Sequence, residues 1–62
     1  MIKIGDRVVV SGRMETPVYV KDIVDDPENA QIILILNWGI WGTSRVYLHD
    51  QDKTWYKYSE SN

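Results

Sequence analysis

Residues 18–24 read Val18-Tyr19-Val20-Lys21-Asp22-Ile23-Val24, and the spacing of their apolar side chains restricts how the chain can fold. Val18 and Val20 lie two positions apart, as in a strand with one buried face. The next large aliphatic residue is Ile23 rather than residue 22, so the alternation slips by one position. A β-bulge or sharp bend near Lys21 and Asp22 accounts for the slip, and small barrels use such bends to turn their corners. The stretch therefore predicts a bent strand.

Four further strands are predicted around this bent strand, which we expect to be the second in the chain. Short runs of β-branched and aromatic residues alternate with Gly, Pro, Asn and Asp clusters, which is typical of strands and turns. The other strands are predicted at residues 7–11, 31–37, 44–49 and 55–58. The glycine-containing segment 37–43 predicts a hairpin tip, and the polar segment 49–54 predicts a connection with a 3-10 turn. The fold class is predicted as all-β and antiparallel.

The alternation within these strands predicts which side chains form the core. In residues 31–37, Ile32, Leu34 and Leu36 share one face, whereas Ile33 and Ile35 share the other. Two apolar faces are typical of a central strand or of one whose back is covered. We expect the remaining inward side chains to be Val8, Val10, Val46, Leu48 and Trp55, with Trp38 as a core cap, and the outward ones to be Arg7, Val9, Arg45, Tyr47 and His49.

The length and composition place limits on the architecture. A chain of 62 residues allows one domain, predicted over residues 1–58, with a frayed tail at 59–62. There is no cysteine, so disulfides cannot stabilise it, and large aromatic residues or self-association must contribute instead. The aromatic residues are three Trp and four Tyr with no Phe, a choice that suits half-buried rings and rings at interfaces.

Five strands with a bend in the second and a short turn before the last resemble an SH3-like barrel of the Tudor or KOW type. The residues that carry this resemblance are Gly5-Asp6-Arg7-Val8-Val9-Val10, Val18-Tyr19-Val20-Lys21-Asp22-Ile23, Trp38-Gly39 and Val46-Tyr47-Leu48. The resemblance extends from Ile4 to Tyr58 and implies a single five-stranded antiparallel barrel. Such barrels bind peptides, modified side chains or nucleic acid. The glycine spacing of a KOW motif is absent, so the resemblance concerns the pattern of the fold.

One surface is predicted to bind a partner. Trp41 lies at the predicted hairpin tip, and an exposed Trp is a candidate hot spot because Trp, Tyr and Arg dominate binding energies at interfaces. Arg45 and Tyr47 project from the outward face of the fourth strand, and Tyr56 and Tyr19 are expected on neighbouring strands. A surface of this composition suits an extended peptide, and a protein or peptide partner is therefore the main prediction.

Catalysis, metals and cofactors are not predicted. The chain has one histidine, His49, and its serines have no evident base, so no activated nucleophile can be assembled. Acidic residues occur in turns, at residues 25–28 and 50–52, where they are expected to be solvated and to keep a small protein soluble. The chain is predicted to be a binding module and not an enzyme.

The net charge of the chain bears on whether its partner is a protein or a nucleic acid. The net charge is −2 and the isoelectric point is about 5.1, which disfavours a general nucleic-acid binder. Single-stranded DNA or RNA remains an alternative through Arg7, Arg13, Lys21 and Arg45. A homodimer formed through Ile33 and Ile35 is a further alternative. The longest apolar run, Ile32 to Leu36, is too short to span a membrane, and together with the lack of cysteine it favours the cytoplasm.

Overall fold

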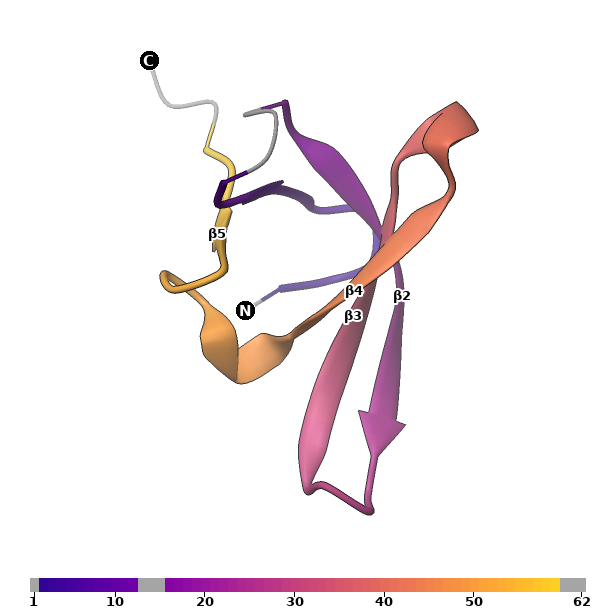
Figure 1. Ribbon diagram of the computed structural model, residues 1–62, viewed down its shortest axis with the longest axis vertical. Coiled ribbons are helices and arrows are strands. Elements are labelled where there is room, and N and C mark those ends of the chain that lie inside the picture. Colours follow the sequence, from indigo (N-terminus) through magenta and orange to yellow (C-terminus); the bar gives the residue numbers. More distant parts are fainter. Residues whose placement is uncertain (1, 13–15, 60–62) are drawn as a thin grey trace.

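The computed structural model describes residues 2–12 and 16–59, which form five β-strands and two short 3-10 turns (Figure 1). All strands belong to one antiparallel sheet with the order β4-β3-β2-β1-β5. This confirms the predicted all-β class and the antiparallel arrangement. In chain order the elements are β1 (Arg7–Val10), β2 (Val18–Asp26), β3 (Gln31–Asn37), η1 (Gly39–Trp41), β4 (Thr43–Tyr47), η2 (Leu48–Asp50) and β5 (Trp55–Lys57).

The irregularity predicted in the second strand is present in β2. Val20 pairs with Leu36 on β3, but the next residue of β3, Ile35, pairs with Asp22, so Lys21 is an extra residue in the ladder. This is the bulge that the spacing of Val20 and Ile23 predicts. It allows Val20 to be buried while Ile23, three residues later, packs against the same core.

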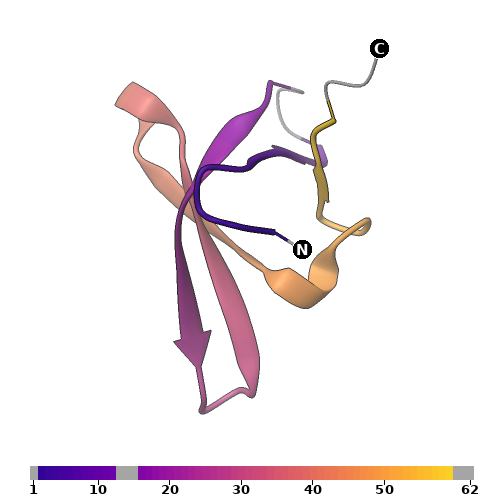
Figure 2. The ribbon, with the colours of Figure 1, turned by 180° about the vertical axis from the view of Figure 1, so that it is seen from behind.

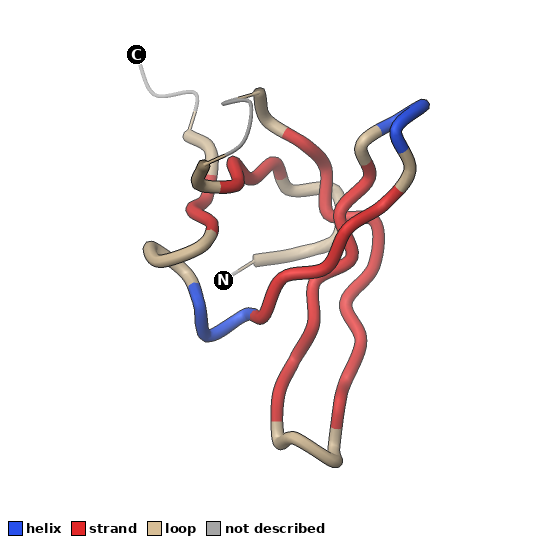
Figure 3. Tube along the Cα trace, in the orientation of Figure 1, coloured by secondary structure: helices blue, strands red, loops and turns tan. Residues whose placement is uncertain are grey.

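Beyond the bulge, β2 and β3 continue as a hairpin that projects from the rest of the molecule (Figures 1 and 3). β2 runs to Asp26, two residues beyond the predicted end of this strand at Val24, because Asp26 pairs with Gln31 in the ladder. The turn itself is confined to residues 27–30. There the Asn29 side-chain amide donates to the Asp26 carboxylate at 2.9 Å, and Ala30 adopts a φ of 52°.

The core lies on the concave side of the curled sheet. Its fully buried side chains include Leu34 and Leu36 of β3 and Trp55 of β5, as the alternation predicts. Val46 and Leu48 pack against them, which confirms the predicted contribution of these two residues. The N-terminal segment crosses the same side in Figure 2, and Ile2 joins the core cluster. A single apolar layer thus connects all five strands.

Several sequence expectations are wrong in detail. Val9, which is expected on the outward face, lies outside the core cluster but is only 3% exposed, and its neighbour across the β1–β5 ladder is the large residue Tyr56. The fourth strand ends at Tyr47, since Leu48 and His49 belong to η2. Ile32 has the predicted parity but lies beyond the core and is 39% exposed. The expectations for residues 13–15 and 60–62 fall outside the described residues.

The sheet is open, so a closed barrel is not confirmed. β4 and β5 are the two ends of the strand order and do not pair with each other. The curl nevertheless brings them together at one point, where the indole Nε1 of Trp55 donates a hydrogen bond to the carbonyl oxygen of Tyr47 at 2.7 Å. A side-chain hydrogen bond therefore links the two edges where a continuous barrel would have a ladder.

Candidate functional site

The turn between β3 and β4 presents two apolar side chains to solvent on a well-defined backbone. The Asn37 side-chain oxygen accepts a hydrogen bond from the Gly39 amide at 2.9 Å, and the Trp38 amide donates to the Gly42 carbonyl at 2.8 Å. At the tip, Ile40 is 94% exposed and Trp41 is 72% exposed, which confirms the predicted exposure of Trp41. These hydrogen bonds fix the position of the Trp41 Cα and therefore restrict the region of space that its indole ring can occupy.

Trp38 has a different environment from Trp41. Its indole Nε1 donates to the Ser44 hydroxyl at 2.6 Å, and its ring packs against the core, which agrees with its prediction as a core cap. This bond orients the ring and satisfies its only side-chain donor. Trp38 therefore forms a fixed wall beside the more exposed Trp41.

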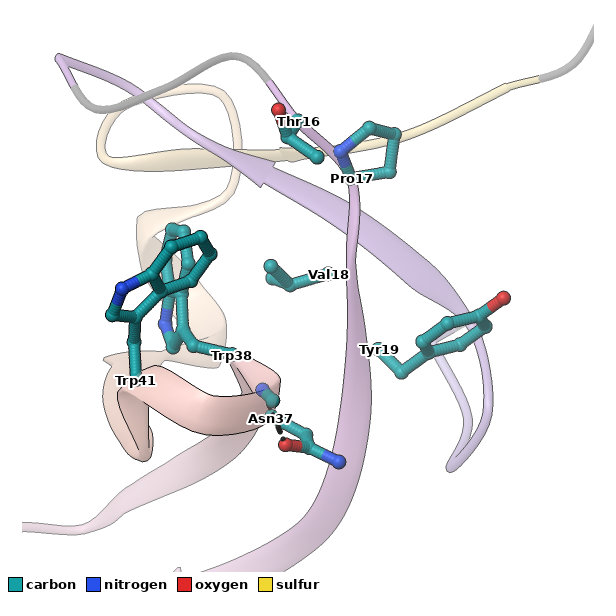
Figure 4. A pocket seen from close by; sticks show the side chains of 8 residues that line it. Thr16, Pro17, Val18, Tyr19, Asn37, Trp38 and Trp41 are labelled. Carbon is teal, nitrogen blue, oxygen red and sulfur yellow. Dashed lines mark hydrogen bonds between the residues drawn. The ribbon is translucent and has the colours of Figure 1, made fainter.

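Trp38 and Trp41 line a pocket of about 280 Å³, which we call the Trp cleft (Figure 4). Both rings lie on the side of β2 to which Val18 points, and Thr16 and Pro17 lie at the end of the cleft nearest the β1–β2 loop. The sequence did not predict this opposite wall. The described residues of the lining are Thr16, Pro17, Val18, Tyr19, Asn37, Trp38, Gly39 and Trp41.

Gly42 ends the turn in a backbone conformation that requires glycine. Its φ is 94° and its ψ is −145°, a region that other residues essentially do not occupy. No neighbouring atom lies within 4 Å of a Cβ built there, so the cost of a side chain comes from the backbone alone.

We expect Gly42→Ala to lower the free energy of unfolding by about 1–3 kcal/mol. It should also shift the amide resonances of Trp38 and Trp41, because the Trp38–Gly42 hydrogen bond must readjust. Urea denaturation combined with two-dimensional NMR measures both effects. Ile40→Ala is the control, since this side chain is almost fully exposed and its removal should change stability by less than about 0.5 kcal/mol. Equal stability of the two variants would contradict the conformational argument.

The structure separates the five residues of the predicted binding surface. Tyr19 is 55% exposed, but its ring projects from the opposite side of β2 to Trp41 (Figure 4). Arg45 and Tyr47 project together from β4, as predicted, and line a second pocket of about 260 Å³ with Ile33 and Val46, here called the Arg45 pocket. Tyr56 is on β5 opposite Val9 and lines neither pocket. The predicted surface is therefore at least two separate sites.

The convex face of β2, β3 and β4 carries rows of paired side chains. Ile35 lies between Asp22 and Arg45 in the ladder, and Ile33 lies between Val24 and Tyr47. Ile33 and Ile35 are consequently half-buried by neighbours in their own chain. The surface that a homodimer would use is thus partly covered, and the dimer remains a prediction.

Several charged residues already have partners within the chain. The Arg7 guanidinium lies over the Tyr58 ring at 5.1 Å from its centroid, and Lys57 lies 3.8 Å from the Asp6 carboxylate. The His49 Nε2 is 3.3 Å from an Asp50 oxygen, and its ring stacks on Tyr47. Across residues 2–12 and 16–59, no cluster of three or more His, Cys, Asp or Glu side chains forms a metal-binding arrangement.

Comparison of the chain with models of known protein families, with curated proteins and with solved structures finds no match. In the part of the chain that the structure describes, no helix has the length and apolar character needed to cross a membrane. The features of the chain that indicate a function are therefore the two pockets and the sheet edges.

Proposed function

We propose that this protein is a small, non-enzymatic binding module that holds an apolar segment of a protein partner in the Trp cleft. The observation that carries the proposal is the high exposure of Trp41 on a turn whose backbone is fixed by hydrogen bonds. An exposed Trp at an interface can contribute a large share of the binding energy. A ring on a pre-organised turn also loses less conformational entropy when a ligand binds.

The size and lining of the cleft support a peptide as the ligand. Pockets for small molecules usually have volumes of roughly 300–1,000 Å³, and the Trp cleft at about 280 Å³ is smaller and open. It suits one or two apolar side chains of a longer segment. Among the described residues of its lining, Tyr19 alone has an ionisable side chain, and that side chain points away, which supports a role in binding rather than catalysis.

Single-stranded nucleic acid is less well supported. Stacking of bases on aromatic rings is normally accompanied by cationic side chains that follow the phosphates. The described lining of the Trp cleft contains no Lys or Arg, and Arg7 is engaged with Tyr58. Arg13, which the nucleic-acid hypothesis also uses, lies outside the described residues. Affinity for oligonucleotides that falls steeply with salt would favour this alternative over a peptide.

We also propose an SH3-like fold and a cytoplasmic location for this protein. Five strands in an antiparallel sheet, a bulged β2 and a 3-10 turn before β5 support an SH3-like arrangement that is open between β4 and β5. The absence of cysteine supports a reducing compartment such as the cytoplasm.

The proposal is tested with peptides selected from a random library for binding to the unmodified protein. We expect Trp41→Ala to weaken the selected peptides roughly 30-fold or more, as loss of a hot spot of about 2 kcal/mol implies. The fold should persist, because the Trp41 side chain is mostly exposed. Fluorescence anisotropy measures the affinities, and circular dichroism measures the fold.

Ile40→Ala is the matched control, since Ile40 neighbours Trp41 and is exposed but does not line the cleft. It should leave the affinities unchanged. Peptides that bind Trp41→Ala as tightly as the unmodified protein would show that the Trp cleft is not the binding site. A library that yields no peptide, together with salt-sensitive oligonucleotide binding, would replace the peptide proposal with the nucleic-acid alternative.

A further inference from the structure

The free edge of β4 has a defined set of outward-facing backbone groups. In an antiparallel ladder, hydrogen-bonded and non-hydrogen-bonded pairs alternate. The Trp38 amide bonds to the Gly42 carbonyl, so in the β3–β4 register the backbone groups of Ser44 and Val46 point toward β3. Those of Thr43, Arg45 and Tyr47 point away from the sheet. The bond from Trp55 Nε1 to the Tyr47 carbonyl agrees with this assignment, since it reaches that group from outside the ladder.

The other described edges of the sheet are protected. On the free side of β2 beyond the bulge, the Ile23 amide donates a hydrogen bond to the Asp22 carboxylate at 2.8 Å, and Asp25 adds a further charge. Charged side chains on edge strands prevent unwanted pairing. On β5, the Trp55 carbonyl accepts a hydrogen bond from the Asp52 amide at 2.6 Å. The segment Thr43–Arg45 of β4 has no comparable cover among the described residues.

We propose that the β4 edge accepts an extended peptide strand with an acidic residue opposite Arg45, in an interaction independent of the Trp cleft. Arg45 is exposed and forms no ion pair within residues 2–12 and 16–59. Its backbone N–H and C=O both face the incoming strand. Addition of a strand to an exposed edge supplies main-chain hydrogen bonds, and opposite charges placed directly across two strands stabilise the pair.

The Arg45 pocket adds a second requirement to the peptide. Arg45 and Tyr47 lie on the same face of β4, and the pocket between them also contacts Ile33 and Val46. In an antiparallel partner, the residue two positions before the acidic one lies opposite Tyr47. It can accept a hydrogen bond from the Tyr47 amide, whereas the Tyr47 carbonyl is already bonded to Trp55. An aliphatic side chain there would enter the pocket. The β4 edge therefore favours a peptide with three consecutive residues of this kind: an aliphatic residue, then any residue, then Asp or Glu.

A second copy of the chain fits this edge less well. Two-fold pairing centred on Arg45 places the two guanidinium groups directly opposite each other, which is unfavourable. Pairing centred on Val46 meets the Trp55–Tyr47 hydrogen bond in both copies, whereas a single peptide strand meets it once. Pairing centred on Ser44 uses only Thr43–Arg45 and still leaves the two Arg45 side chains on a diagonal. The positive charge of Arg45 thus favours an acidic strand from another molecule over a second copy of this chain.

The probe for this proposal is the peptide acetyl-Thr-Val-Thr-Glu-Thr-Val-amide, titrated into the full chain to millimolar concentration. In the free protein, the amides of Ser44 and Val46 should be protected from hydrogen exchange and those of Arg45 and Tyr47 should not. The peptide should protect the Arg45 and Tyr47 amides and shift their NMR signals. The same peptide with Lys in place of Glu should bind roughly tenfold more weakly or worse, since a charge-assisted contact becomes a repulsion.

Substitutions at Arg45 separate the backbone from the charge. Arg45→Pro removes the outward N–H. An edge strand tolerates proline at such a position, so the protein should stay folded while peptide binding is abolished. Arg45→Gln keeps the N–H and should weaken binding by the charge alone. Val46→Pro is the matched control, since its N–H belongs to the β3–β4 ladder and its loss should disrupt the fold. Trp41→Ala should bind the probe unchanged, which distinguishes this site from the Trp cleft.

Three results would overturn the proposal. The first is an absence of change at the Arg45 and Tyr47 amides with millimolar peptide. The second is equal binding of a peptide that is N-methylated at its Glu, because the methyl group blocks edge pairing. The third is a dimer in sedimentation experiments that Arg45→Pro converts to a monomer, which would make a second copy the occupant of the edge.

Discussion

Replacing Trp55 by alanine is expected to unfold the protein at 25 °C. The Trp55 side chain is fully buried, it is the largest in the core, and it makes the hydrogen bond that joins β5 to the end of β4. Truncation of a buried Trp to Ala typically costs about 3–5 kcal/mol. At roughly 0.05–0.15 kcal/mol per residue, a 62-residue domain has a total stability of only about 3–9 kcal/mol. The loss is therefore comparable with the whole stability.

Circular dichroism and urea denaturation measure this effect. Trp55→Phe should retain a cooperative transition with reduced stability, because the ring still fills much of the site while the indole donor is lost. Trp41→Ala is the matched Trp control and should leave the transition almost unchanged, since that ring is mostly exposed. If Trp55→Ala unfolded at the same urea concentration as Trp41→Ala, the assignment of Trp55 to the core would be wrong.

The features of the fold that the sequence predicts are those encoded by local alternation. The interval of three residues between Val20 and Ile23 cannot occur in a regular strand with one buried face, so it predicts the bulge at Lys21. The run from Gln31 to Asn37 is apolar on both faces and is flanked by turn residues, so both ends of β3 could be predicted from the sequence.

The features that the sequence does not predict depend on how the strands curl. Val9 is buried although it lies outside the core cluster, and its alternation with Val8 and Val10 carries no sign of this burial. The hydrogen bond from the Trp55 side chain to the end of β4, which links the two edges of the open sheet, is likewise a long-range property. Local patterns contain no information on the relative twist of distant strands.

In the candidate site, too, the local features could be predicted from the sequence and the long-range ones could not. The exposure of Trp41 could be predicted because it depends on the hairpin tip. The wall formed by Pro17 and Val18 could not, since it is supplied by a segment more than 20 residues earlier in the chain. Tyr19 is predicted to reach the same surface from a neighbouring strand, but its ring projects from the opposite side of β2 to Trp41. Chemical type alone therefore does not define a binding surface.

Leu34→Thr is expected to unfold the protein, whereas Ile33→Thr, one position away on the same strand, is expected to be tolerated. Leu34 is fully buried in the core cluster, between Ile23 and Val46 in the ladder. The substitution removes packing worth about 2–5 kcal/mol and buries a hydroxyl without a partner, at a further cost of about 1–3 kcal/mol. Ile33 is half-buried on the convex face, where a β-branched Thr retains strand propensity and the hydroxyl reaches water, so the cost should be about 1 kcal/mol.

The same pair of variants also tests the homodimer. If Ile33 and Ile35 form an interface between two copies, the midpoint of urea unfolding of the unmodified protein must rise with protein concentration, and Ile33→Thr must remove that dependence. If the chain is a monomer, both midpoints are independent of concentration and differ only by the small cost of the substitution. A concentration-independent midpoint would assign the apolar convex face to contacts within the chain, between Ile33 and its cross-strand neighbours Val24 and Tyr47. The chain would then stabilise its small core by covering its second apolar face itself, and the Trp cleft and the β4 edge would remain available to partners.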